Sequence, residues 1–238
     1  RGTKGAWEGM VCYVNPDRTR RIEALAANAQ WFEDHAPWSP VFRKPEVLGV
    51  TAKAIDVLVE TGDSGPLTPV GINLPNDQAV RERYGSKSVS LVNVNEAYER
   101  ATPQEMRSEF CWDAAEVERA KQWGAFSREL TTEMHEVIGH GSGRMAPHLT
   151  QTPHELLKEQ YSAIEETRAD LVALYFLPDP KLVELGLVPA EHVEQIVLAE
   201  YEQFARGVLV QLRRVREGAQ LEQDHMRNRQ LIVDWLVA

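Results

Sequence analysis

Two histidines that flank a glutamate form the segment of this chain with the clearest chemical potential. His135, Glu136 and His140 lie within the hexapeptide His-Glu-Val-Ile-Gly-His. Neutral imidazoles and carboxylates are the ligands of catalytic zinc, which takes three from the protein and leaves the fourth position to water. A glutamate pair, Glu165 and Glu166, follows about one helix-turn-helix later and offers a third ligand from a separate element. The pattern predicts a zinc site.

The spacing of the two histidines requires an irregular helix. His135 and His140 are five residues apart, whereas the common spacing His-Glu-x-x-His places both rings on one helical face. At about 100° per residue, a regular α-helix would separate the two side chains by about 140°. A single-turn π-bulge would bring them to one side. Gly139 lacks a Cβ and is the expected position of this irregularity.

Chance is the alternative explanation, because such residues also occur together on solvated helix faces. Three features favour a site: apolar residues around the motif, the Gly-Ser-Gly turn at 141–143 that would end the helix, and the glutamate pair on the next helix. Ser142 invites a serine-hydrolase interpretation. A serine directly after a helix is more simply explained by a C-terminal cap and turn.

These motifs resemble the dipeptidyl peptidase III family of zinc exopeptidases. The long-spaced motif at 135–140 and the segment Glu-Glu-Thr-Arg-Ala-Asp at 165–170 carry the resemblance. Segments in matching order extend over most of the chain, from about residue 7 to residue 235. Three of them resemble the family's substrate-binding strand, the strand after it and a later histidine-arginine motif: 71–76, 88–94 and 225–229.

The resemblance implies the metal ligands. His135, His140 and Glu166 would hold one Zn²⁺ per chain. Spacing alone does not decide whether Glu165 or Glu166 is the third ligand, and the resemblance selects Glu166. Asp170 lies four residues after Glu166 and so on roughly the same helical face. Asp170 and Glu165 are expected to accept hydrogen bonds from the ligand histidines and orient them. The alternative for these two carboxylates is an ordinary solvated helix face.

The same resemblance implies a hydrolytic mechanism. Zinc would lower the pKa of its water towards about 7, and Glu136 would take the proton as the water attacks the scissile carbonyl. His225 is expected to be catalytic by stabilising the tetrahedral transition state.

Three residues are expected to bind substrate. Arg229 lies four residues after His225 on a predicted helix, so both can face one cleft. Asn73 and Asn76 match the asparagines that hold the N-terminal part of a bound peptide, a task suited to amide donors and acceptors. Alternatively, the segment around Asn76 simply ends a strand with turn chemistry.

Composition excludes several classes of partner. The net charge of −10 argues against nucleic acid and against an anionic membrane surface. No apolar run reaches the roughly 18–20 residues that span a bilayer. Cys12 and Cys111 are far apart and are interpreted as reduced core residues. We expect a cytoplasmic protein, although the chain begins at Arg1 and its native N-terminus is expected to be absent.

The predicted fold is α+β, with strands early and helices late. Residues 1–112 are expected to form a mixed α/β segment carrying the peptide-binding strand, and residues 113–238 a helical zinc-binding catalytic region. One continuous domain is the alternative. Hydrophobic periodicity and turn residues predict strands at 9–14, 47–59 and 89–94, an extended proline-containing connector at 37–45, and helices at 18–34, 113–140, 153–177, 190–216 and 219–236.

The sequence therefore predicts a zinc-dependent dipeptidyl peptidase that releases dipeptides from the N-termini of short peptides. The alternative is a catalytically silent, zinc-bearing module that binds peptides or a partner. Members of the family are much longer and two-lobed, so the chain resembles their catalytic core. The missing remainder of such an enzyme is an expected partner, and we expect low activity from this chain alone.

Overall fold

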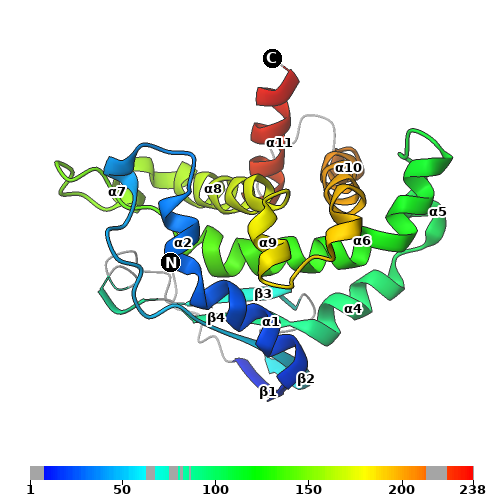
Figure 1. Cartoon of the computed structure of the whole chain (residues 1–238), viewed down its shortest axis with the longest axis horizontal. Helices are drawn as coiled ribbons and strands as arrows, with labels where there is room; N and C mark the ends of the chain where they lie inside the picture. Colours follow the sequence, from blue (N-terminus) through cyan, green and yellow to red (C-terminus); the bar gives the residue numbers. More distant parts are fainter. Residues whose placement is uncertain are drawn as a thin grey trace.

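The strands of this chain form one small sheet, and the helices are stacked on one side of it (Figure 1). The computed structural model describes residues 8–62, 68–74, 80, 83–85, 87–212 and 224–237. The strand order in this part is β1-β2-β4-β3, with β2 and β4 parallel and the other two pairs antiparallel. The strands are β1 (Glu8–Val14), β2 (Thr51–Gly62), β3 (Gly71–Leu74) and β4 (Lys87–Leu91). The α+β prediction is confirmed.

The predicted strand at 89–94 is wrong beyond Leu91, because helix α4 (Val92–Ala101) begins there. Asn93 explains the change. Its amide Nδ2 donates to the carbonyl of Val57 over 2.8 Å, and its Oδ1 accepts the N–H of Val57 over 2.9 Å. This side chain therefore gives β2 the hydrogen bonds that a continuing strand would have supplied.

The predicted helix at 18–34 is two helices, α1 (Pro16–Ala27) and α2 (Ala29–Asp34). Asn15 caps the start of α1 by accepting the N–H of Arg18. Asn28 separates the two helices, and its side-chain amide donates to the carbonyl of Ala24 over 2.8 Å. An asparagine that bonds locally to the backbone competes with the helical pattern, which explains the break.

Within the described residues, the later part of the chain is helical, as predicted, with two corrections; residues 213–223, which include parts of the predicted helices at 190–216 and 219–236, lie outside the described residues. The predicted helix at 153–177 is interrupted at Lys158, which has a φ of 51° and starts a 3₁₀ turn. A short helix at Pro180–Glu184 was not predicted. Asp179 caps its start, and Pro180 occupies its first turn. The helices after α4 are α5 (Gln104–Ser108), α6 (Ala114–Met134), α7 (Pro153–Leu157), α8 (Tyr161–Phe176), α9 (Pro180–Glu184), α10 (Val193–Leu212) and α11 (Asp224–Val237).

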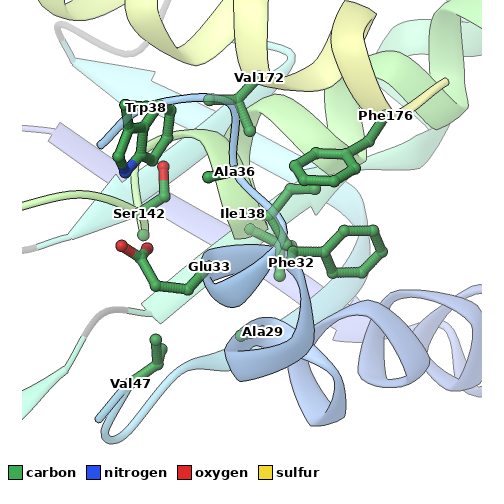
Figure 2. A pocket seen from close by; sticks show the side chains of 12 residues that line it. Ala29, Phe32, Glu33, Ala36, Trp38, Val47, Ile138, Ser142, Val172 and Phe176 are labelled. Atoms are coloured by element: carbon green, nitrogen blue, oxygen red, sulfur yellow. The ribbon is translucent and has the colours of Figure 1, made fainter. Parts of the chain in front are cut away.

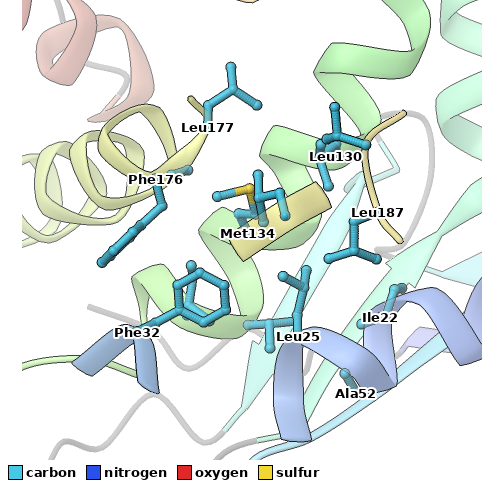
Figure 3. Close-up of a cluster of buried hydrophobic side chains, with 14 of the residues drawn as sticks. Ile22, Leu25, Phe32, Ala52, Leu130, Met134, Phe176, Leu177 and Leu187 are labelled. Carbon is cyan, nitrogen blue, oxygen red and sulfur yellow. The ribbon is translucent and has the colours of Figure 1, made fainter. Parts of the chain in front are cut away.

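One hydrophobic core joins the sheet and the helices (Figure 3). Leu25 of α1, Met134 of α6 and Phe176 of α8 are almost completely buried in it. The core therefore contains side chains from both sides of the expected boundary at residues 112 and 113. Within the described residues, no helix has the length and apolar character needed to cross a membrane.

Phe176→Ala should lower the free energy of unfolding by about 3–5 kcal/mol, because it removes a buried ring from this core. The ring of Phe176 packs edge-on against Phe32, with 5.0 Å between the ring centroids. Urea unfolding would measure the loss. Leu171→Ala on the same helix is the control, since Leu171 is 47% exposed and should cost less than about 1 kcal/mol. Equal losses would contradict the packing described for α8.

Candidate metal centre

A π-helical turn, His135–Gly139, continues α6 and places the two histidines on one side. The N–H of His140 donates to the carbonyl of His135 over 3.0 Å, an i→i+5 bond. The two imidazole rings consequently lie with their centroids 4.7 Å apart and their planes at 89°. The predicted irregularity is confirmed, at the predicted position.

Gly139 allows this turn to pack closely on α8. A Cβ at this position would lie 2.9 Å from both the Cα and the carbonyl oxygen of Ala169. Backbone atoms cannot give way at that distance, so a larger residue would push the turn away from α8. The glycine therefore brings the two histidines to the helix that carries Glu165 and Glu166.

Three side chains from these two elements converge. His135, His140 and Glu166 each offer one ligand atom, and these atoms lie within 4.8 Å of one another. His135 Nε2 is 3.2 Å from Glu166 Oε2, and His140 Nε2 is 3.9 Å from Glu166 Oε1. Glu166 Oε2 is buried and has no hydrogen bond of good geometry within the described residues, although His135 Nε2 lies within hydrogen-bond distance of it. Two imidazoles and a carboxylate fit a divalent metal ion, which would give that oxygen a partner.

Two further carboxylates orient the histidines. The Nδ1 of His135 is 2.7 Å from Asp170 Oδ1, and the Nδ1 of His140 is 3.0 Å from Glu165 Oε1. Each Nδ1–H donates to its carboxylate, which leaves both Nε2 atoms directed at Glu166. The geometry thus separates the two adjacent glutamates. Glu166 faces the Nε2 atoms, whereas Glu165 lies behind one ring.

The electrostatics of the cluster favour a positive charge at its centre. Burial alone would lower the pKa of His135, but hydrogen bonding to Asp170 and the nearby carboxylates raise it to about 10. Burial would raise the pKa of Glu166 and of Asp170, yet the adjacent imidazoles hold both below their usual range. These carboxylates stay ionised and attract a cation.

Glu136 is held by the sheet. The π-turn leaves the Glu136 carbonyl without its usual helical donor, because the N–H of His140 bonds to His135 instead. Asn73 Nδ2 and Ser88 Oγ each donate to this carbonyl over 2.9 Å. The side chain of Glu136 lies against Gly71, where a Cβ would come within 2.6 Å of its Oε1. Burial raises the pKa of Glu136, as suits a proton acceptor.

The predicted substrate residues lie in different surroundings. Asn73 uses its amide nitrogen to hold Glu136, and its Oδ1 is buried without a hydrogen bond within the described structure. Asn76 lies outside the described residues. His225 has a half-exposed side chain, and its Nδ1 is 3.4 Å from Glu166 Oε2. Arg229 packs instead over the ring of Phe204 on α10, 5.7 Å from its centroid. Substrate binding by these residues stays a prediction.

Sequence reasoning missed two polar residues that support the site. Asn228 is completely buried on α11, and its Nδ2 donates to Asp170 Oδ2 over 2.7 Å. Ser88 is a buried polar residue of strand β4, and no feature of the sequence indicated this position. Ser142 does form the predicted cap, since its Oγ donates to the carbonyl of Gly139 over 2.8 Å.

The fold and the site together define an α+β protein with a possible metal site made by a His-His-Glu group. The chain belongs to peptidase family M49, whose model matches residues 1–150 and 146–238.

The chain is also similar to named relatives, and two solved structures share its fold. Dipeptidyl peptidase 3 of Rattus norvegicus is 27% identical over 98% of this chain and 34% of its own length. DPP III from Caldithrix abyssi shares the fold with a TM-score of 0.74, over 97% of this chain and 42% of that chain. Dipeptidyl-peptidase III from Corallococcus sp. strain EGB shares it with a TM-score of 0.77, over 95% of this chain and 40% of that chain. Both are 23% identical to this chain. The chain spans about a third of the length of the relatives.

Glu166→Ala should weaken zinc binding more than the roughly 10- to 100-fold typical for loss of a hydrogen-bond partner behind a ligand, because it removes a ligand. Bound zinc would be measured after dialysis and by chelator competition. Glu136→Ala is the matched control and should retain zinc. If Glu136→Ala emptied the site while Glu166→Ala left it filled, the assignment of these two carboxylates would be wrong.

Proposed function

We propose that this chain is the catalytic core of a zinc-dependent dipeptidyl peptidase, which hydrolyses short peptides near their N-termini. The observation that carries the proposal is the position of Glu136. Its carboxylate is seated against strand β3, and the next residue towards the N-terminus, His135, belongs to the His-His-Glu group. A metal-binding module without catalysis would not require a glutamate in this position.

His135, His140 and Glu166 would hold the zinc ion. When bound, zinc would supply a water of lowered pKa and polarise the scissile carbonyl. Glu136 accepts a proton from the attacking water and then donates it to the leaving amine. Burial raises the pKa of Glu136 in the direction of neutral pH, which suits a group that accepts and then returns a proton. His225 is close to Glu166 and accessible to solvent, which supports the proposal that it stabilises developing negative charge.

Strand β3 is the expected place for the peptide. It lies at the edge of the sheet and pairs only with β4 among the described strands. An extended peptide can add to such an edge through main-chain hydrogen bonds. Selection of a dipeptide requires further residues that anchor the free amine, and these are expected in the remainder of a longer enzyme. The cytoplasmic location stays a prediction.

Glu136→Ala should reduce hydrolysis of a dipeptidyl arylamide by about 10²- to 10⁴-fold, the usual contribution of a general base, while zinc stays bound. Turnover and zinc content would be measured on the same sample. Bound zinc with no chelator-sensitive turnover in the unaltered chain would instead favour the alternative, a catalytically silent module that binds peptides.

Gly71→Ala should lower turnover by up to about 100-fold without loss of zinc, because the new methyl group displaces the Glu136 carboxylate. The displaced atoms belong to a flexible side chain, so the fold should survive. Gly124→Ala is the control, since a Cβ there meets an atom only at an ordinary 3.5 Å. In a Glu136→Ala background, Gly71→Ala should have no further effect. An undiminished further loss would refute the seating of Glu136.

This chain alone should hydrolyse peptides slowly. Positioning of substrate can contribute roughly 7–11 kcal/mol to catalysis and depends on both walls of a cleft, whereas the chain spans 34% of its rat relative. The comparison is between this chain and a chain extended to the length of its relatives, with one dipeptidyl substrate. Comparable kcat/KM values would show that this chain is already a complete enzyme.

A further inference from the structure

Arg168 links α8 to the turn that carries His140. Its Nε and Nη2 donate to the two carboxylate oxygens of Glu165, over 3.0 and 2.7 Å. Its Nη1 donates to the carbonyls of Gly139 and Ser142 and to the Ser142 hydroxyl, over 2.9, 3.0 and 2.9 Å. One guanidinium therefore bridges the carboxylate behind His140 and the backbone on either side of that histidine.

These contacts fix His140 in two ways. Glu165 Oε1 accepts both from Arg168 and from His140 Nδ1, so the ring orientation depends on where Arg168 holds the carboxylate. The bond to the Gly139 carbonyl fixes the backbone directly before His140. Glu33 also holds this loop, since its Oε2 accepts the N–H of Gly143 over 2.8 Å. Figure 2 shows its carboxylate on the side of the neighbouring Ser142. Glu33 reaches only the loop backbone by this bond, whereas Arg168 also reaches the carboxylate that orients the ring.

An arginine suits this task better than a lysine. Its planar fork can bind a carboxylate with two parallel hydrogen bonds and still donate elsewhere, whereas a lysine is a single point charge. The two bonds from Arg168 reach both oxygens of Glu165 and hold the carboxylate where its Oε1 accepts the His140 Nδ1–H. A neutral residue at 168 would leave that carboxylate half-buried beside Glu166 without its cation.

We propose that Arg168 is a positioning residue for the metal site, and that it directs His140 Nε2 at the ion through Glu165 and the Gly139 carbonyl. The inference rests on the proposed function, because it requires that His135, His140 and Glu166 bind a metal. Arg168 itself touches neither the metal ligand atoms nor the reacting groups. Its contribution is to hold one ligand in the orientation that binding needs.

The test measures zinc affinity by chelator competition, and the visible absorption of the cobalt(II)-loaded chain, for Arg168→Lys and Arg168→Met. Both variants should bind zinc about 10- to 100-fold more weakly, the usual effect of losing a partner that orients a ligand. The cobalt spectrum should change, since the position of one ligand changes. Arg144→Gln is the matched control. Arg144 lies in the same loop and its Nε donates to the Val41 carbonyl over 3.0 Å, so its loss should leave affinity and spectrum unaltered.

A double-mutant cycle separates positioning from general stability. If Arg168 acts through Glu165, then in a Glu165→Gln background the substitution Arg168→Lys should weaken zinc binding less than it does in the unaltered chain. Zinc affinity and a cobalt spectrum equal to those of the unaltered chain in Arg168→Lys would overturn the proposal, even with a lowered Tm. If Arg168→Met fails to fold, the measurements on Arg168→Lys alone decide the outcome. An unaltered chain that binds no zinc would refute the proposed metal site itself.

Discussion

The hydrogen bond from the His140 N–H to the His135 carbonyl is the interaction on which the site depends. In a regular helix this N–H would bond to the Glu136 carbonyl instead, and the two rings would point about 140° apart. The wider turn has two structural requirements. The Glu136 carbonyl needs new donors, which Asn73 and Ser88 supply from the sheet. The turn must also approach α8 closely, which Gly139 allows. The sheet and α8 therefore hold the π-turn from opposite sides.

The site also concentrates negative charge in a half-buried place. Burial of ionised carboxylates is costly unless each has a partner. Asp170 has Asn228 and His135 as partners, and Glu165 has Arg168 and His140. Glu166 differs, because its buried Oε2 has no hydrogen bond of good geometry within the described residues. The outer carboxylates of the cluster therefore have their hydrogen-bond partners, whereas the carboxylate at its centre lacks one. A cation would take that central position.

Sequence reasoning predicted the parts of the site that depend on local spacing. The five-residue separation of His135 and His140, with a glycine before the second, was sufficient to predict the π-turn at its position. The motif at 165–170 supplied the candidate carboxylates, but spacing did not decide whether Glu165 or Glu166 is the third ligand, and the family resemblance made that choice. Contacts between distant segments could not be predicted from spacing. Asn93, which replaces strand pairing for β2 and lies in the first turn of α4, occurs in a β-rich run that predicts a strand.

Ser88 and Asn228 were missed for a related reason. Each is a single buried polar residue whose partner lies on another element, at Glu136 and at Asp170. Such pairs leave no periodic signal in the sequence. The break at Asn28 was missed because the apolar spacing of the two short helices is continuous across it. Local hydrogen bonding by one asparagine side chain overrode that pattern.

In the proposed function, strand β3 would connect substrate binding with the position of Glu136 as the base. Side chains of a strand alternate between its faces, so Gly71 and Asn73 share one face. That face meets Glu136: Gly71 leaves space for its carboxylate, and Asn73 holds its carbonyl. The same strand has an edge without a partner among the described strands. A peptide that pairs with this edge would be held by the element that positions Glu136. The base and the scissile bond would then be held by the same strand. Their relative position would be fixed, as catalysis by positioning requires. The catalytic unit of the proposed function would therefore extend beyond the helical region after residue 112, because Asn73 and Ser88 of the sheet hold Glu136.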